Sequence, residues 1–229
     1  MFEREMNMYQ IAIDGPSGAG KSTLAKILAA KLGFIYVDTG ALYRSIGLYM
    51  ETNGIDPKDA EAVVASLPKI TLALEYHEGS QVVLLNGENV GERIRTPQIS
   101  MYASAVSAIP AVRAFLLDTQ RDIAAKNNVI MDGRDIGTVI LPNADVKIFL
   151  VSSFETRARR RVKELLEKGI EASYEEVLAD MIERDKNDSS RAVAPLVPAE
   201  DAVHLDNSEL TLEGTVDAAL AIIREKCAL

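Results

Sequence analysis

Ten residues near the N-terminus, DGPSGAGKST, have the composition of a phosphate-binding loop. They match the pattern Gly-x-x-x-x-Gly-Lys-Ser in full, with an apolar run before it and a helical pattern behind it. The glycines allow consecutive backbone N–H groups to converge on one phosphate, and the N-terminus of the following helix adds partial positive charge. We expect the loop to bind the phosphates of a nucleotide through Gly15, Pro16, Ser17, Gly18, Ala19, Gly20, Lys21, Ser22 and Thr23.

Two residues of the loop and one distant aspartate are candidates for the chemistry at those phosphates. Lys21 would reach the β- and γ-phosphates, and the Ser22 hydroxyl would ligate Mg²⁺. Asp132 closes the apolar run VIMD, so it lies at the carboxyl end of a strand, where open α/β sheets bind ligands. We expect it to hold Mg²⁺ directly or through water. Asp132 alone does not exclude the simpler alternative that it caps the turn after its strand.

Four arginines follow strand ends or lie in the segment before the last strand. Arginine presents two parallel N–H donors to phosphate oxygens, which suits it to hold a second phosphorylated ligand that accepts a phosphoryl group. The alternative for each residue is a surface ion pair with a nearby acid. Their shared position at one edge of the sheet favours the acceptor site for Arg44, Arg134, Arg184 and Arg191.

A second group of basic residues lies on the helix that contains TRARRRVKELLEKG. Arg157, Arg160 and Arg161 have helical spacing, so like charges share one face unless acids or an anion compensate. Glu164 can pair with Arg160 or Arg161, which would make the face an ordinary solvated one. The functional alternative is a mobile lid that brings catalytic arginines, Arg157 and Arg161, over the transferring phosphoryl group beside Lys21.

A fold must position these residues near one another, and the pattern of hydrophobic residues predicts which fold this is. Five short apolar runs alternate with helical periodicity, which is typical of a parallel sheet with helices on both faces. The pattern changes after Pro68, where ITLALEYHEGSQVVLLNGENV predicts antiparallel strands with turns at Glu78-Gly79 and Asn86-Gly87. We expect strands at 9–13, 34–38, 129–133, 146–151 and 202–207. We expect a helix that runs from the phosphate loop to Gly33, and further helices at 41–53, 56–67, 97–108, 111–127 and 153–168. Two more helices should follow, one that begins at a capping box at Ser173 and one that begins at about residue 212.

Composition excludes several classes of protein. The 229 residues are 48% hydrophobic and 26% charged, the balance of a globular domain. A formal net charge of −9 offers no bulk field for nucleic acid or an anionic membrane, so we expect neither as a partner. One cysteine, Cys227, favours a cytoplasmic protein, and we find neither a signal peptide nor a run of about 18 apolar residues.

Five segments together resemble the bacterial cytidylate kinase family, the CMP/dCMP kinases of the nucleoside monophosphate kinase group. They are IDGPSGAGKST, DTGALYRSIG, IRT, DGRDIGTVILPNADVKIFL and RAVAPLVPAEDAVHLD, and the resemblance runs from about Tyr9 to Ala228. The loop alone would not choose among families, whereas DGRDIGT and RAVAPL are far more particular. The hairpin region resembles the extra β-subdomain of the long bacterial form.

The resemblance implies a P-loop kinase three-layer fold with a five-stranded parallel sheet and an inserted antiparallel β-subdomain. It implies one domain over 9–229, with a core (9–38, 110–152 and 201–229), an acceptor-binding insertion (39–109, with the hairpins at 69–95) and a lid (153–200). The implied reaction converts ATP and CMP or dCMP into ADP and CDP or dCDP, with Mg²⁺. A monomer is also implied.

The resemblance also assigns roles to individual residues. Arg44, Arg134 and Arg191 match residues that hold the acceptor phosphate, and Arg184 and Asp188 match those at the ribose. Ser104, Arg113 and Asp135 match those that recognise the base. Two positions vary within the family: Ser22 stands where some members have glycine, and Thr39 stands where some relatives have serine. The Thr39 hydroxyl can still bond the acceptor phosphate.

Two alternatives stay open at this stage. A P-loop kinase for another nucleotide or a small metabolite would share the donor site and differ in the acceptor site. A nucleotide-dependent switch is the other, although the chain has no recognisable Asn-Lys-x-Asp guanine motif. The residues that contact the adenine of ATP are not identified by the sequence.

Overall fold

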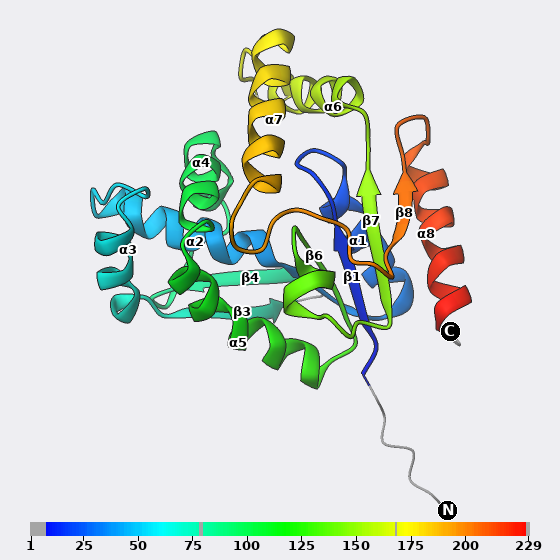
Figure 1. Cartoon of the computed structure of the whole chain (residues 1–229), viewed down its shortest axis with the longest axis horizontal. Helices are drawn as coiled ribbons and strands as arrows, with labels where there is room; N and C mark the ends of the chain where they lie inside the picture. The colour runs from blue at the N-terminus through cyan, green and yellow to red at the C-terminus, as the bar shows by residue number, and fades with distance from the viewer. Residues whose placement is uncertain (1–7, 78–79, 168, 228–229) are drawn as a thin grey trace, which may run out of the picture.

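A five-stranded parallel sheet forms the centre of the molecule in the computed structural model, which describes residues 8–77, 80–167 and 169–227. The strand order is β2-β6-β1-β7-β8, and every neighbouring pair is parallel (Figure 1). The predicted sheet is therefore confirmed, with some strand ends shifted by a residue. The strands are β1 (Gln10–Asp14), β2 (Ile35–Asp38), β6 (Val129–Gly133), β7 (Val146–Val151) and β8 (Val203–Asp206).

Helices cover both faces of this sheet because successive side chains of a strand point to opposite faces. Ile11 and Ile13 of β1 pack with α1 (Lys21–Leu32) and α8 (Leu212–Lys226), whereas Ala12 packs on the other side. That other side carries α5 (Pro110–Lys126) and a single π-helical turn, η3 (Ile136–Ile140). The result is the predicted three-layer arrangement.

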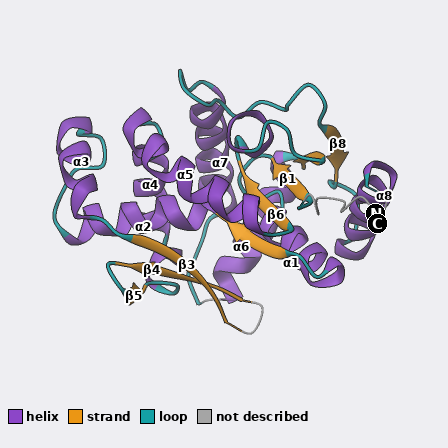
Figure 2. Ribbon diagram, turned by 90° about the horizontal axis from the view of Figure 1, so that it is seen from below, coloured by secondary structure: helices purple, strands orange, loops and turns teal. Residues whose placement is uncertain are grey.

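The segment between β2 and α5 lies to one side of the parallel sheet (Figure 2). Its helices and strands share an apolar cluster to which α5 also contributes. Its three-stranded antiparallel sheet, order β3-β4-β5, confirms the predicted insertion. Asn86 and Gly87 turn β4 into β5 with φ of 51° and 85°, and the Glu78-Gly79 turn lies outside the described residues. The elements are α2 (Thr39–Thr52), α3 (Ala60–Ser66), η1 (Leu67–Lys69), β3 (Leu72–His77), β4 (Ser80–Leu85), β5 (Glu88–Asn89), η2 (Arg93–Arg95) and α4 (Pro97–Val106).

Two helices, α6 (Phe154–Glu167) and α7 (Tyr174–Ser189), stand beyond the carboxyl end of the sheet near the phosphate loop (Figure 1). Ser173 caps α7 as predicted, since its hydroxyl accepts from the Glu176 N–H. Lys168, the predicted last residue of the preceding helix, lies outside the described residues.

One predicted helix start was wrong. The sequence Asp56-Pro57 suggested a cap followed by a helix, but α3 begins at Ala60 and the Asp59 carboxylate accepts from the Ala62 N–H. The sequence offered two aspartates with capping chemistry, and local rules do not decide between them. Among the described residues, no single helix has the length and apolarity to cross a membrane; the bent pair α4 and α5 meets that test by length and composition only.

A side chain at Gly15 of the phosphate loop would clash with the neighbouring strand β7. The φ of Gly15 is 148°, and a Cβ there would lie 2.1 Å from the Leu150 carbonyl oxygen of β7. We expect Gly15→Ala to lower the free energy of unfolding by about 2–5 kcal/mol, through backbone strain and a clash inside the sheet layer. Denaturant unfolding measures this loss.

Gly54→Ala is the matched control, because Gly54 also has a positive φ, 65°, but nothing within 4 Å of the added methyl group. It should cost only the strain of the left-handed conformation, about 1–2 kcal/mol. Equal losses in the two variants would contradict the close approach of the loop to β7.

Candidate active site

The phosphate loop joins β1 to α1 at the carboxyl edge of the sheet. Gly15, Gly18 and Gly20 all have positive φ, and Gly20 stands directly before the first residue of α1. The Lys21 ammonium donates to the Pro16 carbonyl at 2.7 Å, so the side chain folds back over the loop. Lys21 is only 6% exposed, and burial, followed by the charge of Arg134, lowers its pKa well below the usual value.

Asp132 is the last residue but one of β6 and lies beside Ser22 at the start of α1, and hydroxyl groups surround it. Its Oδ2 accepts from the Ser22 hydroxyl at 2.7 Å, its Oδ1 from the Tyr36 hydroxyl at 2.9 Å, and its carbonyl from the Thr39 hydroxyl at 2.8 Å. Burial, and then the nearby Asp38, raise the pKa of Asp132. Burial and the charge of Asp132 likewise raise the pKa of the Tyr36 phenol, which therefore stays a donor.

The pair Ser22 and Asp132 fits a magnesium site by the chemistry of its donors. A hydroxyl and a carboxylate are hard oxygen ligands, and Mg²⁺ in kinases uses one or two such groups together with substrate phosphates and water. Both groups lie beside Lys21 at the amino end of α1, where a phosphate would be bound. The residues present therefore suit the metal that the sequence predicts.

A buried carboxylate at the end of β2 holds Arg44. Asp38 caps α2 through its Oδ1, which accepts from the Ala41 N–H, and its Oδ2 accepts from Arg44 Nη2 at 2.7 Å. The backbone N–H of Asp38 donates to the Gln81 side chain of β4, so the inserted sheet contacts this strand end. The Nε atom of Arg44 is buried and has no hydrogen-bond partner among the described residues.

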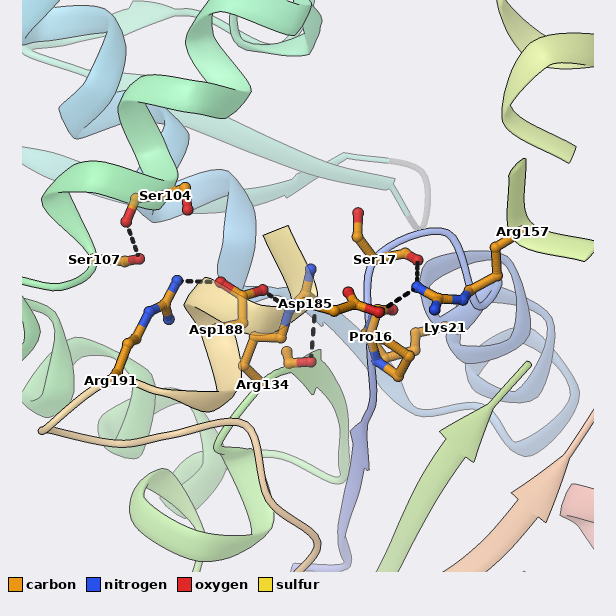
Figure 3. Close-up of polar contacts among 11 residues, drawn as sticks. Pro16, Ser17, Lys21, Ser104, Ser107, Arg134, Arg157, Asp185, Asp188 and Arg191 are labelled. Atoms are coloured by element: carbon orange, nitrogen blue, oxygen red, sulfur yellow. Dashed lines mark hydrogen bonds and ion pairs between the residues drawn. The ribbon is translucent and has the colours of Figure 1, made fainter. Parts of the chain in front are cut away.

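Three of the predicted acceptor-site arginines gather around Asp188 of α7. Oδ2 of Asp188 accepts from Arg134 Nε at 2.8 Å, and Oδ1 accepts from Arg191 (Figure 3). Asp188 is 1% exposed, and although burial works against it, Arg134 and Arg191 lower its pKa. Burial, and then Arg134, lower the pKa of Arg184 to about 10, and the buried Nε of Arg184 has no hydrogen-bond partner among the described residues.

The predicted base-recognition residues lie on three different elements. Arg113 of α5 forms a buried ion pair with Asp135, which follows β6. Another nitrogen of Arg113 donates to the Ser107 carbonyl, and the Ser107 hydroxyl donates to the Ser104 carbonyl at the end of α4. Arg113 is therefore paired with Asp135, and Ser104 is connected to Arg113 through hydrogen bonds that involve Ser107.

The two arginines predicted to be catalytic lie apart from the others. Arg157 is 2% exposed, and its guanidinium donates to the Ser17 carbonyl of the phosphate loop and pairs with Asp185 of α7 at 2.7 Å (Figure 3). Arg161 pairs with Glu164 on the surface of α6. Sequence reasoning anticipated Glu164 as a partner, and a catalytic role for either arginine stays a prediction.

Several polar residues of the site were not identified from the sequence. The Asp14 carboxylate accepts from the N–H groups of Ile136 and Gly137 and so fixes the segment after Asp135, while burial raises its pKa to about 6. Asn207 donates to the Ala19 carbonyl of the loop. Both follow or end apolar runs, as Asp132 does, so position at a strand end was the signal that could have found them.

The fold and the site define a P-loop protein in which partly buried arginines gather at the same end of the sheet as the phosphate loop. Comparison with known proteins identifies the family: the model of the cytidylate kinase family matches residues 11–225. Cytidylate kinase from Fervidobacterium nodosum is 50% identical over 95% of this chain and 97% of its own, and that from Caldicellulosiruptor saccharolyticus is 49% identical over 95% and 96%. This chain belongs to the cytidylate kinase family.

A solved structure supports the fold alone. An uncharacterized protein from Eubacterium ventriosum superimposes with a TM-score of 0.51 at 14% sequence identity, covering 95% of this chain and 97% of that one. Membership of a kinase family implies a nucleotide phosphoryl donor and small nucleotide substrates, and the site described above has the charge to hold them.

Proposed function

We propose that this chain transfers the γ-phosphoryl group of ATP to CMP or dCMP and so forms CDP or dCDP. One observation carries the proposal: the end of β6 reaches both halves of the site within four residues. Asp132 contacts Ser22 of the phosphate loop, Arg134 pairs with Asp188, and Asp135 pairs with Arg113. A single strand end can therefore align a donor, an acceptor phosphate and an acceptor base.

On the donor side, the backbone N–H groups of residues 15–23 and the ammonium of Lys21 would hold the phosphates of ATP. Ser22 and Asp132 would hold Mg²⁺, which, when bound, neutralises charge on the phosphate oxygens. Lys21 now contacts a loop carbonyl, so it is already directed over the loop that would receive the phosphates.

On the acceptor side, Arg44, Arg134 and Arg191 would hold the phosphate, with the Thr39 hydroxyl beside them and Arg184 and Asp188 at the ribose. The Nε atoms of Arg44 and Arg184, which have no hydrogen-bond partner in the part of the chain that the structure describes, support this assignment. A buried donor without a partner costs free energy that an anion would recover.

The pair Arg113 and Asp135 suits cytosine. Cytosine presents O2 and N3 as acceptors and its 4-amino group as a donor, so Arg113 and Ser104 would donate while Asp135 accepts. Uracil reverses the sense at N3 and at position 4, which would leave groups mispaired at about 1–3 kcal/mol each.

Transfer in this site requires no strong general base. Phosphoryl transfer has a loose transition state, so in-line alignment and positive charge supply most of the acceleration. Lys21 and the acceptor-side arginines would provide that charge. Arg157 and Arg161 would contribute if the α6–α7 lid (153–200) closes over the rest of the chain. The rest comprises the core (9–38, 110–152 and 201–229) and the acceptor-binding insertion (39–109). We further propose a cytoplasmic monomer, which the single cysteine and the family resemblance favour.

A panel of acceptors tests the proposal. With Mg-ATP as donor, CMP and dCMP should give the highest kcat/KM, and UMP should fall at least about 10-fold lower because of its mispaired edge. AMP, GMP and a sample without acceptor complete the panel. A better acceptor than CMP and dCMP would overturn the base assignment, and ADP formation that ignores every monophosphate would favour a switch or binding module instead.

A further inference from the structure

A tyrosine on the outer strand of the sheet holds one side of the carboxylate that faces the phosphate loop. The Tyr36 hydroxyl donates to Oδ1 of Asp132, and the Ser22 hydroxyl donates to Oδ2. Tyr36 is 8% exposed and Asp132 is 5% exposed, so water cannot easily replace the phenol as the partner of Oδ1, whereas Ser22 is exposed. Each carboxylate oxygen therefore has its own hydroxyl group, one from β2 and one from α1.

The register of the sheet explains why Tyr36 can reach this carboxylate. Tyr36 lies beside Ile130 and Asp38 beside Asp132, so Tyr36 is diagonal to Asp132 across the β2–β6 pair. Residues two apart on a strand share a face, which places the Tyr36 and Asp132 side chains on the α1 side together. A tyrosine is long enough to span that diagonal.

The aromatic ring itself has a fixed position. It packs in the apolar cluster between the sheet and α1, and the Lys26 ammonium lies 5.6 Å from the ring centroid. The backbone of Asp132 is held separately, since the Thr39 hydroxyl donates to its carbonyl. Loss of the Tyr36 hydroxyl would therefore free Oδ1 of the carboxylate without releasing the strand.

We infer that Tyr36 is a positioning residue for the magnesium site. By occupying Oδ1 it prevents rotation of the carboxylate, because rotation would leave a buried phenol unpaired. Oδ2, beside Ser22, is then the oxygen that faces the metal or a water bound to it. Groups that orient a ligand in this way commonly affect metal affinity by about 10- to 100-fold. The inference rests on the proposed function, which assigns Asp132 to the metal.

The test measures how strongly Mg²⁺ promotes nucleotide binding, and it does not depend on turnover. Calorimetry gives the Kd of an ATP analogue with a methylene group in place of the β–γ bridging oxygen, in excess Mg²⁺ and in excess EDTA. The ratio of the two values is the coupling between metal and nucleotide. In Tyr36→Phe this ratio should fall about 10-fold or more, with the Kd in EDTA unchanged.

Two further variants make the result specific. Tyr9→Phe removes a hydroxyl from a ring that packs on the same cluster, stacked on Phe34, and should leave the coupling ratio as in the unmodified protein. Tyr36→Met removes the same hydroxyl with a flexible apolar side chain and should reproduce the loss, so the conclusion does not depend on one variant.

The outcomes separate this inference from the proposed function. An unchanged ratio in Tyr36→Phe, or an equal loss of affinity with and without Mg²⁺, would overturn the role of Tyr36 while the acceptor panel could still show CMP phosphorylation. Absence of any Mg²⁺ coupling in the unmodified protein would overturn both the metal assignment and the role of Tyr36.

Discussion

Lys21→Met should lower kcat for CMP phosphorylation by about 10²–10³-fold and leave the fold intact. Lys21 is the lysine within the phosphate loop, and a donor directed at charge that develops in the transition state is worth about that factor. The side chain is nearly buried, and burial has lowered its pKa, so the neutral methionine does not introduce a new desolvation cost. Steady-state kinetics with saturating ATP and CMP measure the change.

Lys31→Met is the matched control, because Lys31 lies in the last turn of the same helix and is exposed. It should leave kcat unchanged. Thermal unfolding of both variants excludes a loss of structure as the cause. A kcat for Lys21→Met within a few-fold of the unmodified protein would show that the lysine does not stabilise the transition state, whatever it contributes to ATP binding.

The phosphate loop and the sheet could be predicted because their signals are local. The pattern around Lys21 has one structural meaning, and the nearly all-apolar runs at 129–133 and 146–151 coincide with β6 and β7. Strands buried on both faces admit few polar residues, so their ends are marked by the first polar or glycine residue that follows. The same rule placed Asp132 at the ligand-binding edge.

The partners of the charged residues could not be predicted, because they join distant parts of the chain. Arg134 and Asp188 are 54 residues apart, and Tyr36 and Asp132 are 96 apart. Both contacts depend on strand order and on how α7 packs, which one sequence does not encode in any short window. Arg157 illustrates the limit: its helical spacing left open an acidic partner or a bound anion, and no local pattern indicated that its guanidinium would bind the Ser17 carbonyl and Asp185.

Helix α7 connects the two halves of the site. Asp185 and Asp188 are three residues apart, so they lie on neighbouring parts of one helix face. Asp185 pairs with Arg157, which contacts the phosphate loop, and Asp188 pairs with Arg134 and Arg191 (Figure 3). A shift of this helix would therefore change donor-side and acceptor-side contacts together, which suits an enzyme that must align two nucleotides.

Asp188→Asn should have the largest effect on the acceptor site. It removes the negative charge that two arginines share, at a position that is 1% exposed. Loss of one member of a buried ion pair costs about 3–5 kcal/mol, and because Arg134 is partly exposed we expect about 2–4 kcal/mol of unfolding free energy. The KM for CMP should rise about 100-fold, with little change in the KM for ATP.

Acid should erase the stability difference between the unmodified protein and Asp188→Asn. The folded-state pKa of Asp188 is lowered by Arg134 and Arg191, against the effect of burial. Its contribution to stability is therefore full above the unfolded value of about 3.9 and is lost as pH falls through the lower folded-state pKa. Denaturant unfolding from neutral pH to below pH 4 measures this convergence. Asp180→Asn, an exposed change on the same helix, should alter stability by no more than about 0.5 kcal/mol at any pH.

Sulfate separates the electrostatic cause from simple misfolding. If the arginines around position 188 repel one another in Asp188→Asn, an anion bound among them restores the missing charge. Sulfate at 100 times its Kd adds about 2.7 kcal/mol to any state that binds it. The increase in melting temperature with sulfate should therefore be larger for Asp188→Asn than for the unmodified protein, where the carboxylate already occupies that position. An equal increase in both proteins would show that Asp188 is not the counter-charge of this cluster, and a KM for CMP that stays unchanged would remove the cluster from the acceptor site.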